Sequence, residues 1–483
     1  MTFFSEWSRR EFLAALPAVS AIPLLDSSAQ AAPAPEALRA GAAKVEITLP
    51  LGANNGGVIL RGGPAREVHD DLHARCLVLD DGRTQLAFVV CDLRMIHREL
   101  VDRAKRLAAA ALGWPVENML VAATHTHAAP GLVQIQKAEI DLWYADFVVV
   151  RIADAIRRAA ARLAPARIGW GSVAKPEHVF NRRWKVAPGS APADPFGKTA
   201  DAVVTNPTRT QAVLEPAGPV DPELSILSVR HADGRPLAVL ANYGLHYVGG
   251  YAPGSVSSDY FGLFSERLGR LLGAEADDDS FVGMMSNGAS GDVNNTDRKT
   301  PLERQEPWKR MQIVAEDLAQ AAARVCREAH YHDTVPLDVA VQELELSVRR
   351  PDEGRLIWAR DVVAGIGDLK KLTRPQVYAE EAIALAAGPA SVRVPLQAVR
   401  IGDLRITAAP CEVFAETGLE IKRRSRTPTF LIELANGFNG YLPTAEQHNW
   451  GGYETWPART SYLAVDSAAT IRDALIELVE KIS

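Results

Sequence analysis

Two histidines two residues apart follow a short apolar run in this chain. Residues 118–131 read NMLVAATHTHAAPG, and the apolar run 120–123 is too short for a helix and typical of a strand. His125 and His127 follow it, ahead of a Pro-Gly turn. Residues two apart in an extended backbone point to one side, so both imidazoles are expected to face the same way. Imidazole is a common metal ligand and acid or base, so the pair predicts a polar pocket wall; a hydrogen-bonded strand end is the plainer alternative.

Other predicted strands also end in polar residues and glycine-rich turns. The strand 237–243 precedes His246, the strand 281–285 precedes the turn SNGASGD, and the strand 404–409 precedes Glu412. The strand 429–434 leads into NGFNGY, which ends at Tyr441. Ligands and catalytic groups of layered α/β proteins gather at strand ends, because the sheet fixes their position while the loops diverge. Each segment alone is typical of an ordinary turn, but together they predict one site.

The elements that must position these residues alternate along the chain. Apolar periodicity predicts helices over residues 97–112, 138–163, 260–272, 304–330, 376–387 and 468–482, with strands between them. This order predicts an α/β fold of mixed β-sheets layered with helices, with at least one parallel crossover. Residues 185–221 are rich in Pro, Gly and Ala and show no periodicity. A loop of that length in a compact domain is typical of an active-site cover.

Composition narrows the class of partner. The 483 residues contain 53 Lys and Arg against 59 Asp and Glu, a formal charge of −6, which argues against nucleic acid as a partner. The four cysteines are far apart without a CxxC spacing, and are expected to be small buried residues. No apolar run after the N-terminal segment is long enough to span a bilayer, so no transmembrane segment is expected in the mature chain. A homodimer is expected from base rates alone.

The N-terminal segment is expected to be a targeting signal. Residues 8–13 read SRREFL, and an apolar run to residue 25 and the sequence Ala-Gln-Ala at 29–31 follow. This segment resembles a bacterial twin-arginine export signal, which carries folded proteins. We therefore expect a signal peptide over residues 1–31, a linker over 32–37 and a catalytic domain over 38–483. The expected location is the periplasm or outside the cell.

Eight segments carry a resemblance to a known family: HDDLHARCLVLDD, ATHTHAAPG, GPVDPELSIL, NYGLHYV, SSDYFG, SNGASGDVNN, AAPCEVFAETG and NGFNGYLPTAEQHNWGGYE. Their order resembles that in the catalytic, N-terminal domain of neutral/alkaline non-lysosomal ceramidases, in the bacterial ceramidase-like branch. The resemblance covers essentially the whole mature chain. It implies a neutral-ceramidase-like fold without the C-terminal immunoglobulin-like domain that ceramidases add.

The resemblance implies a zinc site and a set of catalytic residues. The family's zinc ligands fall on His125, His246, Glu412 and Tyr441, a donor set that suits catalytic zinc and leaves a position for water. Three further family positions, which imply catalytic roles, are His127, Arg182 and Tyr453, with Arg183 as a substitute for Arg182. His127 is expected to move protons, and Arg182 and Tyr453 to bind a developing negative oxygen. Substrate contacts are expected from Asn294, Asn181 and Asp292.

The chain departs from the family in places that bear on substrate and mechanism. Asn294 stands where ceramidases carry a serine important to activity, and asparagine cannot form an acyl-enzyme. Cys411 precedes the expected ligand Glu412, and a buried structural thiol is favoured over a metal ligand. The long loop 185–221 differs from the family in the region expected to cover the site. Zinc chemistry therefore transfers more readily than ceramide specificity.

The sequence predicts an exported, Zn²⁺-dependent amidohydrolase that cleaves the N-acyl amide bond of ceramide-like or other N-acyl substrates. Water activated by zinc would attack the carbonyl carbon. One alternative is a metal-dependent esterase, lactonase or carbohydrate-active enzyme on the same scaffold. Sugar sites need polar and aromatic walls, whereas an acyl chain needs an apolar tunnel. A second alternative is a non-catalytic periplasmic binding protein. In each case the partner is a small-molecule or lipid-like substrate.

Overall fold

A central eight-stranded sheet forms the main layer of the protein. The computed structural model describes residues 37–55, 63–133, 140–274, 281–298, 300, 305–367 and 372–482, so the expected signal peptide and nearly all of the linker lie outside the described residues. The strand order is β15-β13-β12-β8-β1-β3-β4-β6. These strands are β1 (Arg39–Glu46), β3 (His73–Asp80), β4 (Gln85–Cys91), β6 (Met119–Ala123), β8 (Ala164–Ala174), β12 (Glu223–His231), β13 (Pro236–Tyr243) and β15 (Val282–Asn287).

A four-stranded sheet packs against the first. Its order is β17 (Leu337–Ser347), β18 (Ser391–Ile401), β19 (Leu404–Ala408) and β21 (Thr429–Ile432). Side chains that alternate along the strands supply both faces of the large sheet: Leu77 and Phe88 face the small sheet, while Val78 and Val89 face the helices. This alternation is the period of two that buries a strand on both sides. The two sheets therefore share one apolar core.

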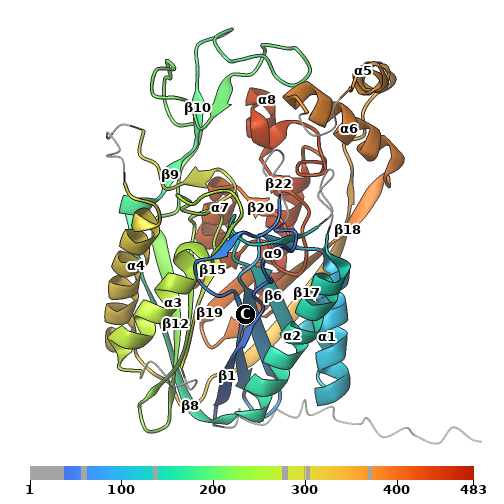
Figure 1. Ribbon diagram of the computed structural model, residues 1–483. Helices are drawn as coiled ribbons and strands as arrows, with labels where there is room; N and C mark the ends of the chain where they lie inside the picture. The colour runs from blue at the N-terminus through green and yellow to red at the C-terminus, as the bar shows by residue number, and fades with distance from the viewer. Residues whose placement is uncertain are drawn as a thin grey trace, which may run out of the picture. The chain divides into compact units, whose positions relative to one another are not determined.

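Helices cover the outer faces of both sheets. Figure 1 shows α1 (Arg98–Leu112) with α2 (Leu142–Ala161) over one half of the large sheet and α3 (Asp259–Leu272) with α4 (Lys309–Glu328) over the other. α7 (Ala415–Ser425) and α9 (Ser467–Lys481) pack on the small sheet. The layers are thus helices, large sheet, small sheet and helices. The predicted α/β fold of mixed sheets and helices is confirmed.

The predicted parallel crossover is present three times. β4 pairs in parallel with β6 across α1, β13 with β15 across α3, and β19 with β21 across α7. Each of the six helices predicted from periodicity occurs, with its ends shifted by a few residues. The carboxyl ends of these strands carry His125, His246 and Glu412 in the segments that follow them. The sheet topology therefore brings together residues that are far apart in the sequence.

Three helices of the described residues were not predicted from the pattern: α5 (Glu353–Ala364), α7 and α8 (Ala445–Trp450). Within α5 only Ala359 is buried, so its apolar residues form no one-sided stripe that periodicity can detect. Its start is nevertheless encoded, since the Asp352 side chain accepts a hydrogen bond from the Arg355 amide as an N-cap. α5 pairs with α6 (Arg374–Ala387) at the end of the molecule that also carries α8 (Ala445–Trp450) in Figure 1.

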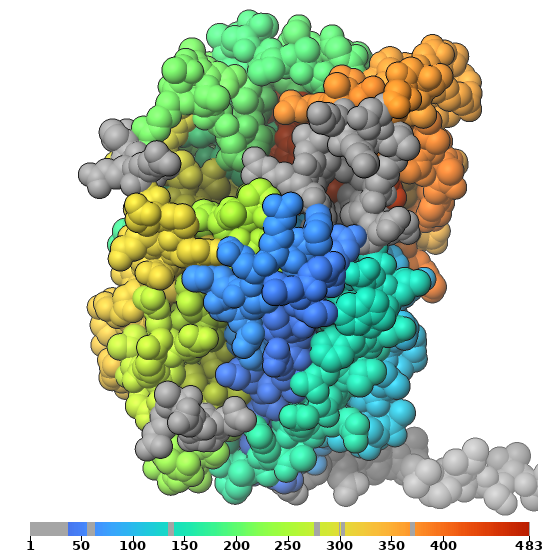
Figure 2. Space-filling model, viewed as in Figure 1, coloured from blue at the N-terminus to red at the C-terminus, as the bar shows by residue number. Residues whose placement is uncertain are grey.

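The loop 185–221 meets the α5 and α6 segment at that end. Figure 2 shows the green surface around residue 200 beside the orange surface of these helices. The guanidinium of Arg355 lies 3.3 Å from the centre of the Phe196 ring, and the rings of Trp358 and Tyr378 contact Phe196 edge-on. Residues 185–221 are called the roof segment below. Its central aromatic residue is anchored by a helix pair far along the chain.

Two further predictions concern cysteines and membrane spans. All four cysteines are buried and unpaired, as expected for small core residues. Cys411 packs in the core between the small sheet and α9, and burial raises the pKa of its thiol. Of the helices in the described residues, none combines the length and the apolar character needed to cross a membrane.

Candidate metal centre

The turn after β6 places His125 and His127 side by side. The backbone of His125 has a φ of 70°, in the left-handed region, so the expected extended backbone is wrong. The Thr124 and His125 amides donate to the carbonyls of Cys91 and Leu93, which turns the chain out of the strand. The two rings are perpendicular, yet their Nε2 atoms lie 3.2 Å apart. The imidazoles converge as predicted, through the turn rather than through strand alternation.

His246 brings a third imidazole to the same point from the segment after β13. Its Nε2 lies 3.0 Å from the Nε2 of His125, and the three histidines form a group with metal-ligand spacing. The Nδ1–H of His125 donates to the Arg94 carbonyl at 2.7 Å, and that of His246 donates to the Ser290 carbonyl at 3.2 Å. With the proton on Nδ1, each neutral ring presents a lone pair at Nε2. Two lone pairs at this distance repel each other unless a cation lies between them.

Glu412 adds a negative charge beside these nitrogens. Its Oε2 lies 3.3 Å from the Nε2 of His125 and 3.8 Å from that of His246. The same oxygen is buried and accepts no hydrogen bond from the described residues. A buried carboxylate oxygen without a donor is costly unless a charge compensates it. This atom therefore points to an ion held among the imidazoles.

The donor set fits a zinc ion. Zinc binds imidazole nitrogen and carboxylate oxygen at about 2.0–2.2 Å, which in a tetrahedral site separates two ligand atoms by about 3.3 Å. The contacts of 3.0, 3.2 and 3.3 Å described above lie close to that spacing. Burial, and then the neighbouring His125, lower the pKa of both His127 and His246 well below the usual value. Both rings are held neutral, the state in which imidazole binds metals.

Tyr441 lies next to Glu412 through a short parallel pair of strands. β20 (Glu412–Val413) and β22 (Tyr441–Leu442) place these two residues opposite each other, so their side chains leave the same face. Burial, and then the charge of Glu412, raise the pKa of the Tyr441 phenol well above the usual value. The ring of Tyr453 lies 5.7 Å from the Tyr441 ring, edge-on. Tyr441 thus lies beside Glu412 and Tyr453 beside Tyr441, while their roles at the site stay predictions.

Arg182 is buried against this group rather than exposed on the surface. Its Nε donates to Glu454 Oε1 at 2.9 Å and its Nη2 to the Gly291 carbonyl at 2.7 Å. The guanidinium lies 5.4 Å from the centre of the Tyr441 ring. Glu454 was not predicted, although it follows Tyr453 directly in the sequence. The structure therefore fixes Arg182 at the edge of the histidine cluster through a carboxylate.

Arg183 takes a different position. It is fully buried, and its Nη1 pairs with the other oxygen of Glu454 at 2.5 Å. Its remaining donors reach the Gln447 side chain and the Gly451 carbonyl. Burial alone would raise the pKa of Glu454, but Arg183 and Arg182 hold it below the usual value. Arg183 is thus a packing and ion-pair residue, which favours Arg182 for the role at the site.

The three expected substrate-contact residues separate into two groups. Asn294 lines a pocket beside the cluster and donates to the Asn206 side chain at 2.6 Å. Asn181 and Asp292 are buried and hydrogen bonded to each other at 2.7 Å, and Asp292 also accepts from the Ala415 amide. Burial raises the pKa of Asp292 to about 6. These two residues hold the turn behind the pocket, and their contact with substrate stays a prediction.

Two residues that were not predicted from the sequence, Glu433 and Gly291, contact the backbone of residues 412 and 413. Glu433 accepts hydrogen bonds from the Ser290 hydroxyl at 2.5 Å and from the Val413 amide at 2.7 Å. Burial, with Glu412 as a further cause, raises its pKa well above the usual value. The sequence did contain a signal for Glu433, because an acidic residue within the apolar run FLIEL is unusual. Gly291 packs so close that a Cβ there would meet the Glu412 carbonyl at 2.5 Å.

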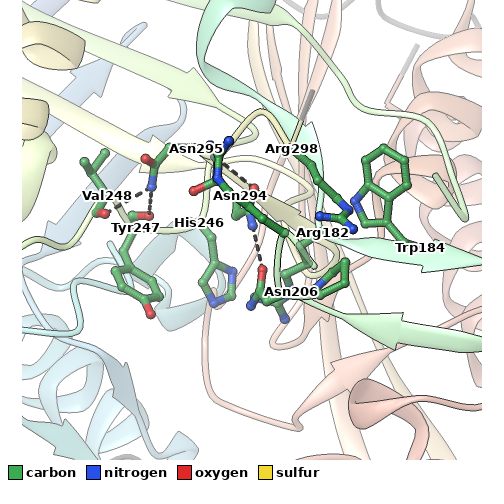
Figure 3. A pocket seen from close by; sticks show the side chains of 12 residues that line it. Arg182, Trp184, Asn206, His246, Tyr247, Val248, Asn294, Asn295 and Arg298 are labelled. Carbon is green, nitrogen blue, oxygen red and sulfur yellow. Dashed lines mark hydrogen bonds between the residues drawn. The ribbon is translucent and has the colours of Figure 1, made fainter. Parts of the chain in front are cut away.

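A pocket of about 320 Å³ opens beside the cluster, with His246 in its wall. Figure 3 shows Tyr247 and Val248 on one side of His246, and Arg182, Trp184 and Arg298 on the other. Most of the wall is polar or aromatic, with Pro207 and Val248 as aliphatic members, and it includes Asn206 and Arg209 of the roof segment. The candidate metal ligand His246 and the roof segment therefore border the same space.

The fold and the histidine cluster can now be compared with those of known proteins. A mixed α/β fold with a buried His-His-His-Glu cluster at its strand ends defines a protein with a candidate metal site. Residues 62–306 match the family model for the N-terminal domain of neutral/alkaline non-lysosomal ceramidase, half of the chain, and the chain belongs to that family. Curated proteins offer no significant match.

Two solved structures with a similar fold are those of ceramidases. The crystal structure of neutral ceramidase from Pseudomonas aeruginosa superposes with a TM-score of 0.66 at 18% identity, over 92% of this chain and 74% of that chain. A structure of a ceramidase complexed with C2 gives a TM-score of 0.66 at 18% identity, over 92% of this chain and 75% of the other. At this identity the likeness supports the fold alone, and the neutral-ceramidase-like fold predicted from the sequence is confirmed.

Proposed function

We propose that this protein is a zinc-dependent hydrolase that cleaves the amide bond of N-acyl compounds. The observation that carries the proposal is the buried Glu412 Oε2, which faces the Nε2 atoms of His125 and His246 and has no hydrogen-bond donor among the described residues. Family membership supports amide hydrolysis as the reaction. We propose His125, His246, Glu412 and Tyr441 as the zinc ligands, and His127 as a neighbour that moves protons.

The residues around the proposed zinc site would have separate roles in the reaction. Zinc at this site would supply Lewis acidity and activate a water molecule near neutral pH. His127 is held neutral, so its ring can take a proton and pass it to the leaving amine nitrogen. Arg182 and Tyr453 would hold the carbonyl oxygen as it gains negative charge. Glu454 keeps Arg182 in place for this role.

The polar pocket wall favours a second candidate on the same scaffold. Trp184, Asn206 and Asn294 provide the aromatic and amide groups that sugar sites need, and an aliphatic chain would gain little beside them. This candidate is a metal-dependent enzyme that acts on acidic carbohydrates. It uses the same zinc ligands and differs in the bond cleaved.

One experiment tests metal, reaction and substrate together. Zinc content is measured for the wild type, His246→Ala and the control His330→Ala, whose side chain is exposed. All three are assayed on N-acyl lipids, esters and uronate-containing sugars. We expect about one zinc per chain and amide cleavage in the wild type and control, and neither in His246→Ala. Zinc-free wild type would overturn the metal assignment, and cleavage of sugars alone would favour the second candidate. Zinc bound without any turnover would favour a binding protein.

We further propose export by the twin-arginine route, which rests on SRREFL at residues 8–13. Fractionation of bacterial cells that express the full chain tests it. Replacement of Arg9 and Arg10 by Lys is expected to retain the protein in the cytoplasm. Unchanged export of this double variant would contradict the route.

A further inference from the structure

We infer that the pocket beside His246 recognises an anionic group, so that the preferred substrate is an N-acyl compound whose amine part carries a carboxylate, sulfonate or phosphate. This inference rests on the proposed function, since it names the substrate class of that site. Three arginines, Arg182, Arg209 and Arg298, line the pocket, and its described lining contains no Asp or Glu. Three cations around one cavity without a lining carboxylate form a site for a negative ligand.

Arg209 and Arg298 differ from Arg182 in how their positive charge is compensated. Arg182 pairs with Glu454. Arg209 donates to the Thr300 carbonyl at 2.8 Å, and Arg298 donates to the Gln211 carbonyl. Among the described residues, neither has an ion-pair partner within 4 Å, and each guanidinium has further N–H groups to donate. Within the described part of the chain, the pocket's cations without an ion-pair partner are therefore Arg209 and Arg298.

Other contacts hold these groups in place for a ligand. The guanidinium of Arg298 lies 5.9 Å from the centre of the Trp184 ring, and Figure 3 shows the two side chains together at the pocket wall. Asn294 and Asn206 are joined across the pocket by a hydrogen bond of 2.6 Å, and Thr296 N–H donates to the Asn294 side chain. Arginine forks held in this way suit the oxygen pair of an oxyacid.

The amine part of the substrate is the part that fits here. Burial of an aliphatic chain against arginine and asparagine would desolvate these groups without a hydrogen bond in return. The acyl chain therefore belongs outside this pocket. His246 stands in the wall, so a group bound by Arg298 lies in the pocket that also borders the proposed zinc site. An anionic amine part would place the scissile amide beside the histidines.

Binding and turnover are measured with four matched compounds. N-dodecanoylglycine, N-dodecanoyltaurine and N-dodecanoyl phosphoethanolamine carry a carboxylate, a sulfonate and a phosphate, and N-dodecanoylethanolamine is neutral. Calorimetry measures binding below micelle-forming concentration, to zinc-loaded and chelator-treated wild type. We expect at least one anionic compound to bind about tenfold or more tightly than the neutral one, even without zinc. The preferred compound identifies the oxyacid.

The double variant Arg209→Gln, Arg298→Gln tests the residues. We expect the selectivity for the anionic over the neutral compound, in binding and in kcat/KM, to fall at least about tenfold. Arg235→Gln is the control, since Arg235 pairs with Asp233 in an exposed β12–β13 turn, and it is expected to keep the wild-type selectivity. Circular dichroism and thermal unfolding check that the double variant folds.

Two results would overturn the inference. The first is a wild type that binds the neutral compound as tightly as all three anions, and the second is an anion preference that survives in a folded double variant. Failure of the proposed function gives a different pattern, in which anions bind through Arg209 and Arg298 but no amide is cleaved. Loss of folding in the double variant is resolved with the single variant Arg298→Gln, for which the same two outcomes apply.

Discussion

The metal cluster and the roof segment border one pocket but are built differently. The cluster stands on strand ends and tight turns, where backbone hydrogen bonds such as His125 N–H to the Leu93 carbonyl fix each residue. The roof segment is mostly loop, with one short strand, β11 (Val203–Thr205), paired with β10 (Arg183–Lys185). Side-chain contacts also hold it, such as Lys185 with Glu215 and Phe196 with Arg355. Strand ends hold the reactive side chains in fixed positions, whereas a loop that tolerates changes in length can alter which substrate binds. The metal cluster and the roof segment can therefore vary separately.

The largest expected effect concerns the fourth zinc ligand. Under the proposed assignment, Tyr441→Phe weakens zinc binding by more than about 100-fold, since even residues behind a ligand cost about 10- to 100-fold. His127→Gln is expected to keep zinc and lower kcat by about 10²- to 10⁴-fold, the range of a lost acid or base. Zinc titration and kcat are measured for both. The reverse pattern would make His127 the ligand, as its 3.2 Å contact with His125 allows.

The next effect tests how Arg183, just before the roof segment, anchors the chain to the buried Glu454. Arg183→Met removes one of two arginines on Glu454 and is expected to lower the free energy of unfolding by about 3 kcal/mol, because a buried carboxylate loses a partner. Urea unfolding measures the change. The matched control is Arg235→Met at an exposed pair, with an expected loss below about 1 kcal/mol. Equal losses in both variants would contradict the anchoring role.

The smallest effect is a pH dependence at His448 in α8. Burial lowers its pKa from 6.5 to about 3, with Arg349 and Arg183 as further causes. Because the folded pKa is depressed, the neutral ring stabilises the fold above pH 6.5, and this stability is lost as pH falls toward 3. His448→Gln removes the titration. We expect the wild type to lose about 2 kcal/mol more than the variant between pH 7 and pH 5. Parallel losses would exclude His448 as the cause.

Much of the architecture could be predicted from the sequence, because apolar periodicity of two or 3.6 residues is local. Strand β13 and helix α1 follow the predicted bounds closely. The convergence of His125, His246 and Glu412 was predicted through resemblance to a family, and strand-end logic alone left it open. The left-handed backbone of His125 was missed, since contacts with residues before it in the chain impose it.

Contacts between distant segments could not be predicted. Arg182 and Glu454 lie 272 residues apart, and no local pattern marks them as partners. The same holds for Arg355 on Phe196, because α5 has almost no buried face. Charge compensation is a property of the folded chain. Arg209 and Arg298, which have no ion-pair partner among the residues that the structure describes, therefore became visible only in the structure.

The contact of Phe196 with Arg355, Trp358 and Tyr378 has a consequence for local opening. Two segments that share an anchor cannot separate from the body independently without breaking the same contacts. Local unfolding proceeds in cooperative units, so the roof segment and the α5–α6 pair form one such unit. Their backbone amides are expected to exchange with solvent at a common rate, and a protease cut in one would expose the other. Access to the zinc site would then be governed by a helix pair that touches neither zinc nor substrate.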